Sequence, residues 1–279
     1  MFLGLPGSRL YAYTGGKPFD PRLPCVVFVH GAQHDHSVWI LQSRYLAHHG
    51  CAVLALDLPG HGRSEGPPAR TVERIAEQVA AALAPLASPR LLLAGHSMGS
   101  LIALEVARRL PARVAGVALL GTAAPMRVAD ALLAATRDDP PTAMDMINVW
   151  SHSPVVAPFA ARPGNPAPGF NVVWQNLRLM QRLAAVNGAD VLPTDFAACN
   201  AYDGALDAAR ALQCPALFIL GGRDQMTPPK AAQSLIEACA KPQVVTLPAT
   251  GHAMMAENPD GVRRALAAFA QQVFAGVAA

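Results

Sequence analysis

The sequence lacks the features of disordered, nucleic-acid-binding and membrane-spanning chains. Only 15% of its 279 residues are charged, while 52% are hydrophobic, and this balance argues against disorder. The formal net charge is +3 with Lys and Arg scattered along the chain, so we expect neither a nucleic acid nor a membrane surface as a partner. No apolar stretch approaches the length of a transmembrane helix. These absences predict a soluble, globular protein.

Paired cysteines and a secretion signal are missing as well. The five cysteines contain no Cys-x-x-Cys pair, and an odd number does not suit a disulfide framework. Reduced thiols packed as small core residues fit the pattern better and indicate a reducing compartment. Residues 1–6 have no basic stretch and include Pro6, which is unlike a signal peptide. We therefore expect a cytoplasmic location.

Short apolar stretches alternate with amphipathic segments over most of the chain. The apolar stretches are typical of strands that are buried on both faces of a sheet. Strands are expected at residues 10–13, 25–29, 52–56, 91–94, 114–120, 214–220 and 243–247, and helices at 37–49, 71–83, 229–239 and 259–274, with one more helix directly after Ser97. This order predicts an α/β fold with a mostly parallel, doubly wound sheet.

The strand pattern lapses between residues 126 and 205. Helices interrupted by proline and glycine are predicted there, notably at 153–169, and their apolar side chains are numerous enough to pack against an edge of the sheet. We accordingly expect a core formed by residues 1–125 and 206–279 and a helical insertion at 126–205. The insertion is expected to cover the functional site as a cap, although an ordinary helical subdomain would give the same pattern.

One pentapeptide, Gly95-His96-Ser97-Met98-Gly99, joins an expected strand to a helix. A serine on such a sharp turn needs small neighbours, which explains Gly95 and Gly99. The Met98 N–H at the helix start would point toward negative charge on a substrate oxygen. The pattern alone occurs by chance in roughly one chain in ten of this length. Its meaning therefore depends on whether Ser97 has partners.

A serine hydroxyl becomes a good nucleophile only beside a base that a third group orients. His252 and Asp224 each follow an expected strand, so they should lie on the same edge of the parallel sheet as Ser97. His252 would take the Ser97 proton, and Asp224 would fix the imidazole tautomer. Asp57 and Asp203 are alternative acids, but neither has the strand-Gly-x-Asp placement.

Taken together, these motifs resemble those of the α/β-hydrolase family over nearly the whole chain. The matching segments are His30-Gly31, Asp57-Leu58-Pro59-Gly60-His61-Gly62-Arg63-Ser64, Gly95-His96-Ser97-Met98-Gly99, Gly222-Arg223-Asp224 and Gly251-His252. The resemblance implies that Ser97, Asp224 and His252 form a catalytic triad. It also implies an oxyanion hole made by the backbone N–H groups of Ala32 and Met98, and a cap at the helical insertion.

Departures from related enzymes narrow the resemblance. Dehalogenases and epoxide hydrolases carry an aspartate nucleophile where this chain has Ser97. His30-Gly31 continues as Ala32-Gln33, which is unlike lipases, proline iminopeptidases and C–C bond hydrolases. Four residues are candidate substrate contacts: His34, Trp150, Trp174 and Met180. A metal at His34, Asp35 and His36 is disfavoured for want of a further well-spaced ligand, so we expect neither metal nor cofactor.

The sequence therefore predicts a serine hydrolase that cleaves a small to medium, largely apolar carboxylic ester through an acyl-enzyme. Lactonase, thioesterase, amidase and C–C bond hydrolase activities would use the same triad and stay open. A hydrolase-derived ligand-binding protein with little turnover is the alternative from another class. The expected partner is a small-molecule substrate, and a monomer and a homodimer are both compatible with the sequence.

Overall fold

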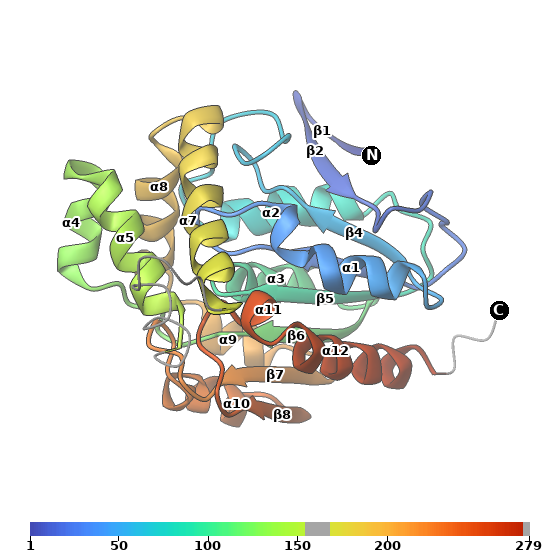
Figure 1. The fold of residues 1–279 in the computed structure, drawn as a ribbon. Coiled ribbons are helices and arrows are strands. Elements are labelled where there is room, and N and C mark those ends of the chain that lie inside the picture. The colour runs from blue at the N-terminus through green and yellow to red at the C-terminus, as the bar shows by residue number, and fades with distance from the viewer. Residues whose placement is uncertain (154–167, 276–279) are drawn as a thin grey trace.

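The structure, a computed structural model, describes residues 1–153 and 168–275. Its centre is an eight-stranded sheet with the strand order β1-β2-β4-β3-β5-β6-β7-β8 (Figure 1). The strands are β1 (Phe2–Leu5), β2 (Ser8–Tyr13), β3 (Cys25–Val29), β4 (Ala52–Leu56), β5 (Leu91–His96), β6 (Val114–Leu120), β7 (Ala216–Gly221) and β8 (Pro242–Leu247). Strands β3 to β8 pair in parallel, whereas β1 and β2 are antiparallel at one edge. The mostly parallel α/β fold expected from the sequence is confirmed.

The buried strands match the sequence prediction closely because each is apolar along its whole length. Strands β3, β4 and β6 have every residue buried and have the expected bounds. Strand β1 was not predicted, since only Leu3 of its four residues is buried and no apolar run marks it. It forms because Gly7, with a φ of 77°, turns the chain back to pair β1 with β2.

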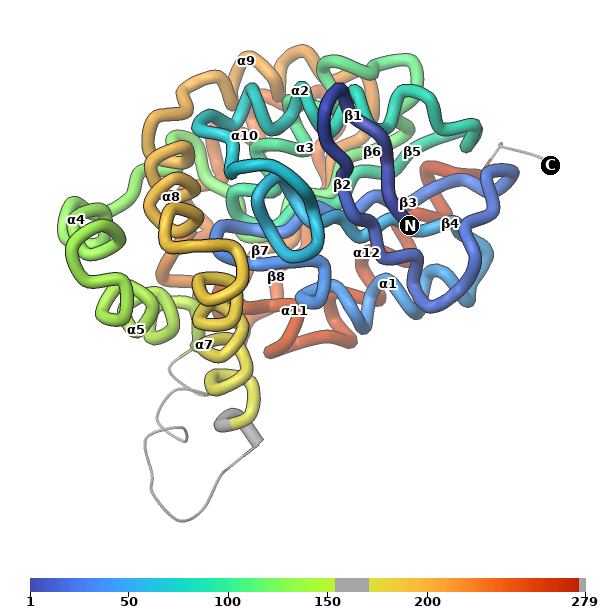
Figure 2. Tube along the Cα trace, turned by 90° about the horizontal axis from the view of Figure 1, so that it is seen from above, coloured from blue at the N-terminus to red at the C-terminus, as the bar shows by residue number. Residues whose placement is uncertain are grey.

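Helices cover both faces of the sheet, as a parallel sheet requires (Figure 2). One face packs against α2 (Val72–Leu83), α3 (Met98–Arg109), α9 (Ala205–Arg210), the 3₁₀ helix η2 (Pro229–Ala232) and α10 (Gln233–Ala238), and the other against η1 (His36–Trp39), α1 (Ile40–Ala47), α11 (Met254–Glu257) and α12 (Pro259–Phe274). Helix α2 begins at the expected cap, because the Thr71 hydroxyl accepts the Arg74 N–H at 3.2 Å. Two apolar layers thus enclose the sheet.

The helical insertion lies at one end of the sheet and has an apolar cluster of its own (Figure 1). Its helices are α4 (Asp130–Asp138), α5 (Pro140–Ser151), α7 (Pro168–Asn187) and α8 (Val191–Ala201). The cluster consists of Leu132, Ala143, Met144, Ile147, Met180, Leu192 and Phe196. The proline-rich break predicted at 153–169 falls almost entirely outside the described residues.

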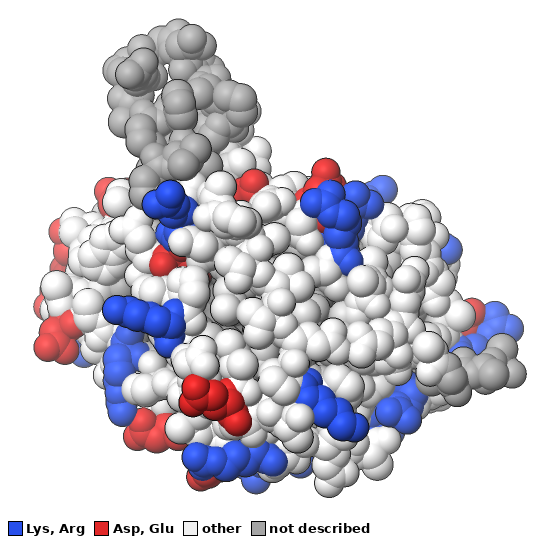
Figure 3. Space-filling model, turned by 90° about the horizontal axis from the view of Figure 1, so that it is seen from below, with Lys and Arg blue, Asp and Glu red and all other residues white. Residues whose placement is uncertain are grey.

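Charged side chains are sparse on the surface, as expected from the low charge content of the sequence. On the face seen from below, positive and negative side chains are interspersed among uncharged residues (Figure 3). Within the described ranges, none of the helices is both long and apolar enough to span a membrane.

Candidate active site

Ser97 lies on a strained turn between β5 and α3. Its backbone has a φ of 52° and a ψ of −123°, a region that costs a non-glycine residue about 1–3 kcal/mol. A Cβ added at Gly95 would collide with the Gly99 carbonyl oxygen, and one added at Gly99 would collide with that of Val29. The two glycines therefore permit the close approach that the sequence predicted. The turn leaves Ser97 partly accessible while its neighbours are buried.

His252 and Asp224 form a buried pair at the ends of neighbouring strands. The His252 Nδ1–H donates to Asp224 Oδ2 at 2.8 Å, and the two residues are only 5% and 4% exposed. Thr227 fixes the carboxylate, since its backbone N–H donates to Oδ1 and its hydroxyl to Oδ2, both at 2.8 Å. Sequence analysis missed Thr227; its position three residues after an aspartate, typical of a side-chain-capped turn, was the available signal.

His96 holds the backbone of His252 in place. Its Nε2–H donates to the His252 carbonyl oxygen at 2.9 Å, and the two rings lie 4.6 Å apart. Burial lowers the pKa of His96 well below its usual value, and the neighbouring His252 lowers it further. His96 is therefore neutral at physiological pH and adds no positive charge beside His252.

A cavity of about 240 Å³ lies between Ser97, His252 and the helical insertion. Ser97, His252 and Ala32 line it together, and so do the predicted contacts His34 and Trp150. The insertion and adjoining segments supply a largely apolar wall: Met126, Val128, Ala129, Leu132, Ile147, Phe196 and Met226. Trp174 and Met180 do not line this cavity. Trp174 is 51% exposed on α7, and Met180 is fully buried in the apolar cluster of the insertion.

Ala32, in the loop after β3, lines the cavity together with Ser97. Hydrogen bonds from Gln33 to the helical insertion hold this loop. Gln33 has a φ of 53°, its N–H donates to Asp195 Oδ2 at 2.8 Å, and its side-chain amide donates to the Met180 carbonyl oxygen at 3.0 Å. The Met98 N–H, in the first turn of α3, has no intrahelical acceptor. Ala32 therefore lines the same cavity as Ser97, and Met98 follows Ser97 directly at the start of α3.

Asp195 also forms a buried ion pair with His61. The ring of His61 places Nε2 at 2.8 Å from Asp195 Oδ2 and Nδ1 at 3.0 Å from the Pro59 carbonyl oxygen, so both nitrogens carry protons. Burial lowers the pKa of His61, but attraction to the Asp195 carboxylate outweighs it and the pKa is raised. Sequence analysis did not predict a role for Asp195. The available signal was that Asp195 is the single charged residue of the otherwise uncharged α8, but the sequence did not indicate its partner.

A second contact ties the insertion to the loop that carries His252. The Ala253 N–H donates to the Ser151 carbonyl oxygen at 2.8 Å. Glu257 Oε2 accepts the N–H groups of Ser153 at 3.1 Å and of Gly251 at 3.2 Å. The insertion therefore contacts both loops that line the cavity beside Ser97.

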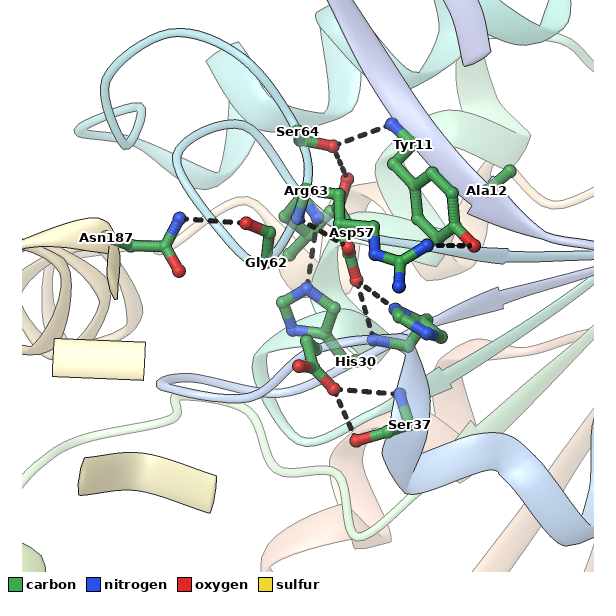
Figure 4. Close-up of polar contacts among 12 residues, drawn as sticks. Tyr11, Ala12, His30, Ser37, Asp57, Gly62, Arg63, Ser64 and Asn187 are labelled. Atoms are coloured by element: carbon green, nitrogen blue, oxygen red, sulfur yellow. Dashed lines mark hydrogen bonds and ion pairs between the residues drawn. The ribbon is translucent and has the colours of Figure 1, made fainter. Parts of the chain in front are cut away.

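The carboxylates of the Asp35, His36 and Asp57 cluster are already engaged by protein groups, including Arg182 of α7, which pairs with Asp35. Figure 4 shows the polar contacts around Asp57. Asp57 Oδ1 accepts the backbone N–H of His36 at 2.8 Å and the ring Nδ1–H of His36 at 2.7 Å. Asp57 Oδ2 accepts the backbone N–H of Arg63 at 2.8 Å. Asp35 caps η1 by accepting the Ser37 N–H at 2.8 Å. Asp57, the alternative acid, thus joins its own loop to His36, whereas Asp224 contacts His252.

Comparisons with known proteins agree with this architecture. Curated relatives include the dihydrolipoyllysine-residue acetyltransferase component of the acetoin cleaving system of Pseudomonas putida, 31% identical over 94% of this chain and 67% of that protein. The pimeloyl-(acyl-carrier protein) methyl ester esterase of Chromobacterium violaceum is 29% identical over 88% of this chain and 93% of that protein.

Solved structures show the same fold. The enol-lactonase of Burkholderia xenovorans superimposes with a TM-score of 0.79 at 23% identity, covering 96% of this chain and 99% of that one. At that identity the likeness concerns the fold alone. A family model described as the alpha/beta hydrolase family matches residues 26–265. On this match, and with the fold and the Ser97 turn described above, the chain belongs to the α/β-hydrolase family.

Proposed function

We propose that this protein is a serine hydrolase that cleaves a small to medium, largely apolar carboxylic ester. The observation that carries the proposal is one cavity lined by Ser97, on its strained turn, and by His252, whose Nδ1–H is held by Asp224. The Asp224 contact leaves Nε2 of His252 as the free acceptor of the ring. An imidazole in that tautomer is the base that a serine nucleophile needs.

The proposed reaction has two acyl-transfer steps. His252 takes the Ser97 proton while Oγ attacks the ester carbonyl, and the N–H groups of Ala32 and Met98 stabilise the negative oxygen. The C–O bond breaks as His252 returns the proton to the leaving alcohol. Water, activated by the same imidazole, then hydrolyses the acyl-enzyme and releases the acid.

The substrate class follows from the cavity wall. Its lining is mainly apolar, and Arg127 is the single charged side chain among the described residues that form it. Burial of apolar substrate groups against this wall is favourable, at about 25 cal/mol per Å². The name of the Chromobacterium relative, a methyl ester esterase, supports an ester as the substrate.

Pre-steady-state hydrolysis of p-nitrophenyl butyrate tests the proposal. We expect release of p-nitrophenol by the unaltered protein and none above background by Ser97→Ala, with Ser234→Ala, a serine of α10 outside the cavity, behaving like the unaltered protein. Retained hydrolysis in folded Ser97→Ala would contradict the proposed nucleophile. A folded protein that binds the ester without hydrolysing it would favour a ligand-binding role.

A further inference from the structure

A second cavity adjoins the first at His252. It has a volume of about 230 Å³ and lies between η1, α1, α7 and α11. The views in Figures 1 and 2 show α7 beside α11, and these helices are in contact. The two cavities share four lining residues: His34, His96, Ser151 and His252.

The chemical groups of the site are divided unequally between the two cavities. Ser97, Gly31 and Ala32 line the first cavity and not the second, whereas His252 lines both. During acyl transfer the carbonyl carbon and its oxygen stay with the nucleophile and the oxyanion donors. The departing oxygen must instead reach the group that protonates it. The second cavity therefore lies on the side of the proton donor.

We propose that the second cavity binds the alcohol part of the ester and that the first binds the acyl part. This proposal rests on the serine hydrolase function proposed above. In the step concerned, the C–O bond of the tetrahedral adduct breaks and the His252 Nε2–H transfers its proton to the departing oxygen. The products are a neutral alcohol in the second cavity and an acyl ester on Ser97.

The lining of the second cavity defines the kind of alcohol it accepts. Its apolar wall includes Val38, Ile40, Leu41, Leu179 and Met255, and the described residues around it include no Asp, Glu, Lys or Arg. A charged leaving group would lose hydration there without gaining an ionic partner. An apolar cavity of about 150 Å³ accommodates a benzene ring. The second cavity therefore has room for an uncharged benzyl or hexyl group.

A polar chain of hydrogen bonds begins at His34, which lines both cavities. His34 Nε2 lies 3.0 Å from Asn176 Oδ1, and Asn176 Nδ2 donates to Asn148 Oδ1 at 3.0 Å. These contacts link the loop after β3 to α7 and α5. Burial lowers the pKa of His34, which keeps the boundary uncharged at physiological pH.

Two ester series test the division. One series keeps an acetyl group and changes the alcohol from methyl to hexyl and benzyl, and the other keeps methanol and lengthens the acyl chain to hexanoyl. Leu179→Trp narrows the second cavity, and Val128→Trp, at a comparably half-buried aliphatic position, narrows the first. Thermal unfolding and fluorophosphonate labelling of Ser97 establish that each variant is folded with its nucleophile in place.

We expect Leu179→Trp to lower the hexyl-to-methyl alcohol ratio of kcat/KM by about 10-fold or more and to leave the acyl-chain ratio within about twofold. Val128→Trp should give the reverse pattern. If folded, labelled Leu179→Trp lowers the acyl-chain ratio instead, or changes neither ratio, the assignment is overturned. Absence of hydrolysis of every ester by the unaltered protein would overturn the proposed function itself, which is a different result.

Discussion

The core and the helical insertion contribute to the candidate site in different ways. The core supplies Ser97, Asp224 and His252 from turns that follow β5, β7 and β8. Core residues also make the hydrogen bonds to the Asp224 carboxylate, to the imidazole Nδ1 of His252 and to the His252 carbonyl oxygen. The insertion supplies most of the apolar wall, and it also holds the loop containing Ala32 through Asp195. In the proposed reaction, the core therefore supplies the groups that break and form bonds, while the insertion affects substrate fit and the position of the proposed oxyanion donor Ala32.

The largest effect should come from the core nucleophile. Ser97→Ala removes the hydroxyl that forms the acyl-enzyme, so ester hydrolysis should fall by roughly ten-thousand-fold or more. Steady-state rates with a p-nitrophenyl ester measure this, beside Ser234→Ala. A fall of less than about tenfold would show that Ser97 is not the nucleophile.

Asp224→Asn should be almost as damaging. The amide can accept or donate at Nδ1 of His252, so the imidazole loses its fixed tautomer, and we expect kcat to fall by roughly a thousand- to ten-thousand-fold. Because the change is nearly isosteric, the thermal unfolding midpoint serves as the control for folding. Asp57→Asn provides a further contrast, since the Asp57 carboxylate contacts Arg63 and His36. A larger loss of kcat in Asp57→Asn than in Asp224→Asn would favour the alternative acid.

Asp195→Asn tests whether the insertion acts on catalysis. The change weakens the acceptor of the Gln33 N–H and of His61, so the loop that holds Ala32 should shift. We expect kcat to fall about tenfold with a smaller change in KM, because an oxyanion donor acts mainly in the transition state. Asp190→Asn is the matched control, because Asp190 is the exposed N-cap residue of the same helix and its side chain makes no cap hydrogen bond. Equal kcat and KM values in the two variants would show that the insertion contributes only the apolar wall of the cavity.

The smallest effect concerns stability and pH. The pKa of His61 is raised above its ordinary 6.5 in the folded protein, so the stability from its pair with Asp195 is fully present below that value. This stability is lost as pH rises through the folded-state pKa. The unfolding midpoint of the unaltered protein should therefore exceed that of Asp195→Asn by several degrees near pH 6 and by less near pH 9. A difference that grows with pH would contradict a protonated His61.

Much of the core was predictable because its signals are local. A fully apolar strand such as β3 appears in the sequence as a continuous run, and the Ser97 turn carries its glycines beside it. Strand β1 gave no such signal, since its pairing depends on a turn at Gly7 and a partner strand. Thr227 was missed because its role depends on the orientation of the Asp224 carboxylate.

The insertion was less predictable because its contacts are long-range. Asp195 meets Gln33 and His61 across more than 130 positions of sequence, and no spacing rule links them. The positions of Trp174 and Met180 depend on how α7 is rotated about its axis, which an apolar helix sequence leaves undetermined. The structure turns Trp174 outward and Met180 into the apolar cluster, while Trp150 lines the cavity.

The most direct test of the central claim is the intact mass of the protein after incubation with a fluorophosphonate, with Ser97→Ala measured in parallel. The account predicts one covalent adduct on the unaltered protein and none on the variant. An adduct that persists on folded Ser97→Ala, or no adduct on either protein, would contradict the claim that Ser97 is an activated nucleophile.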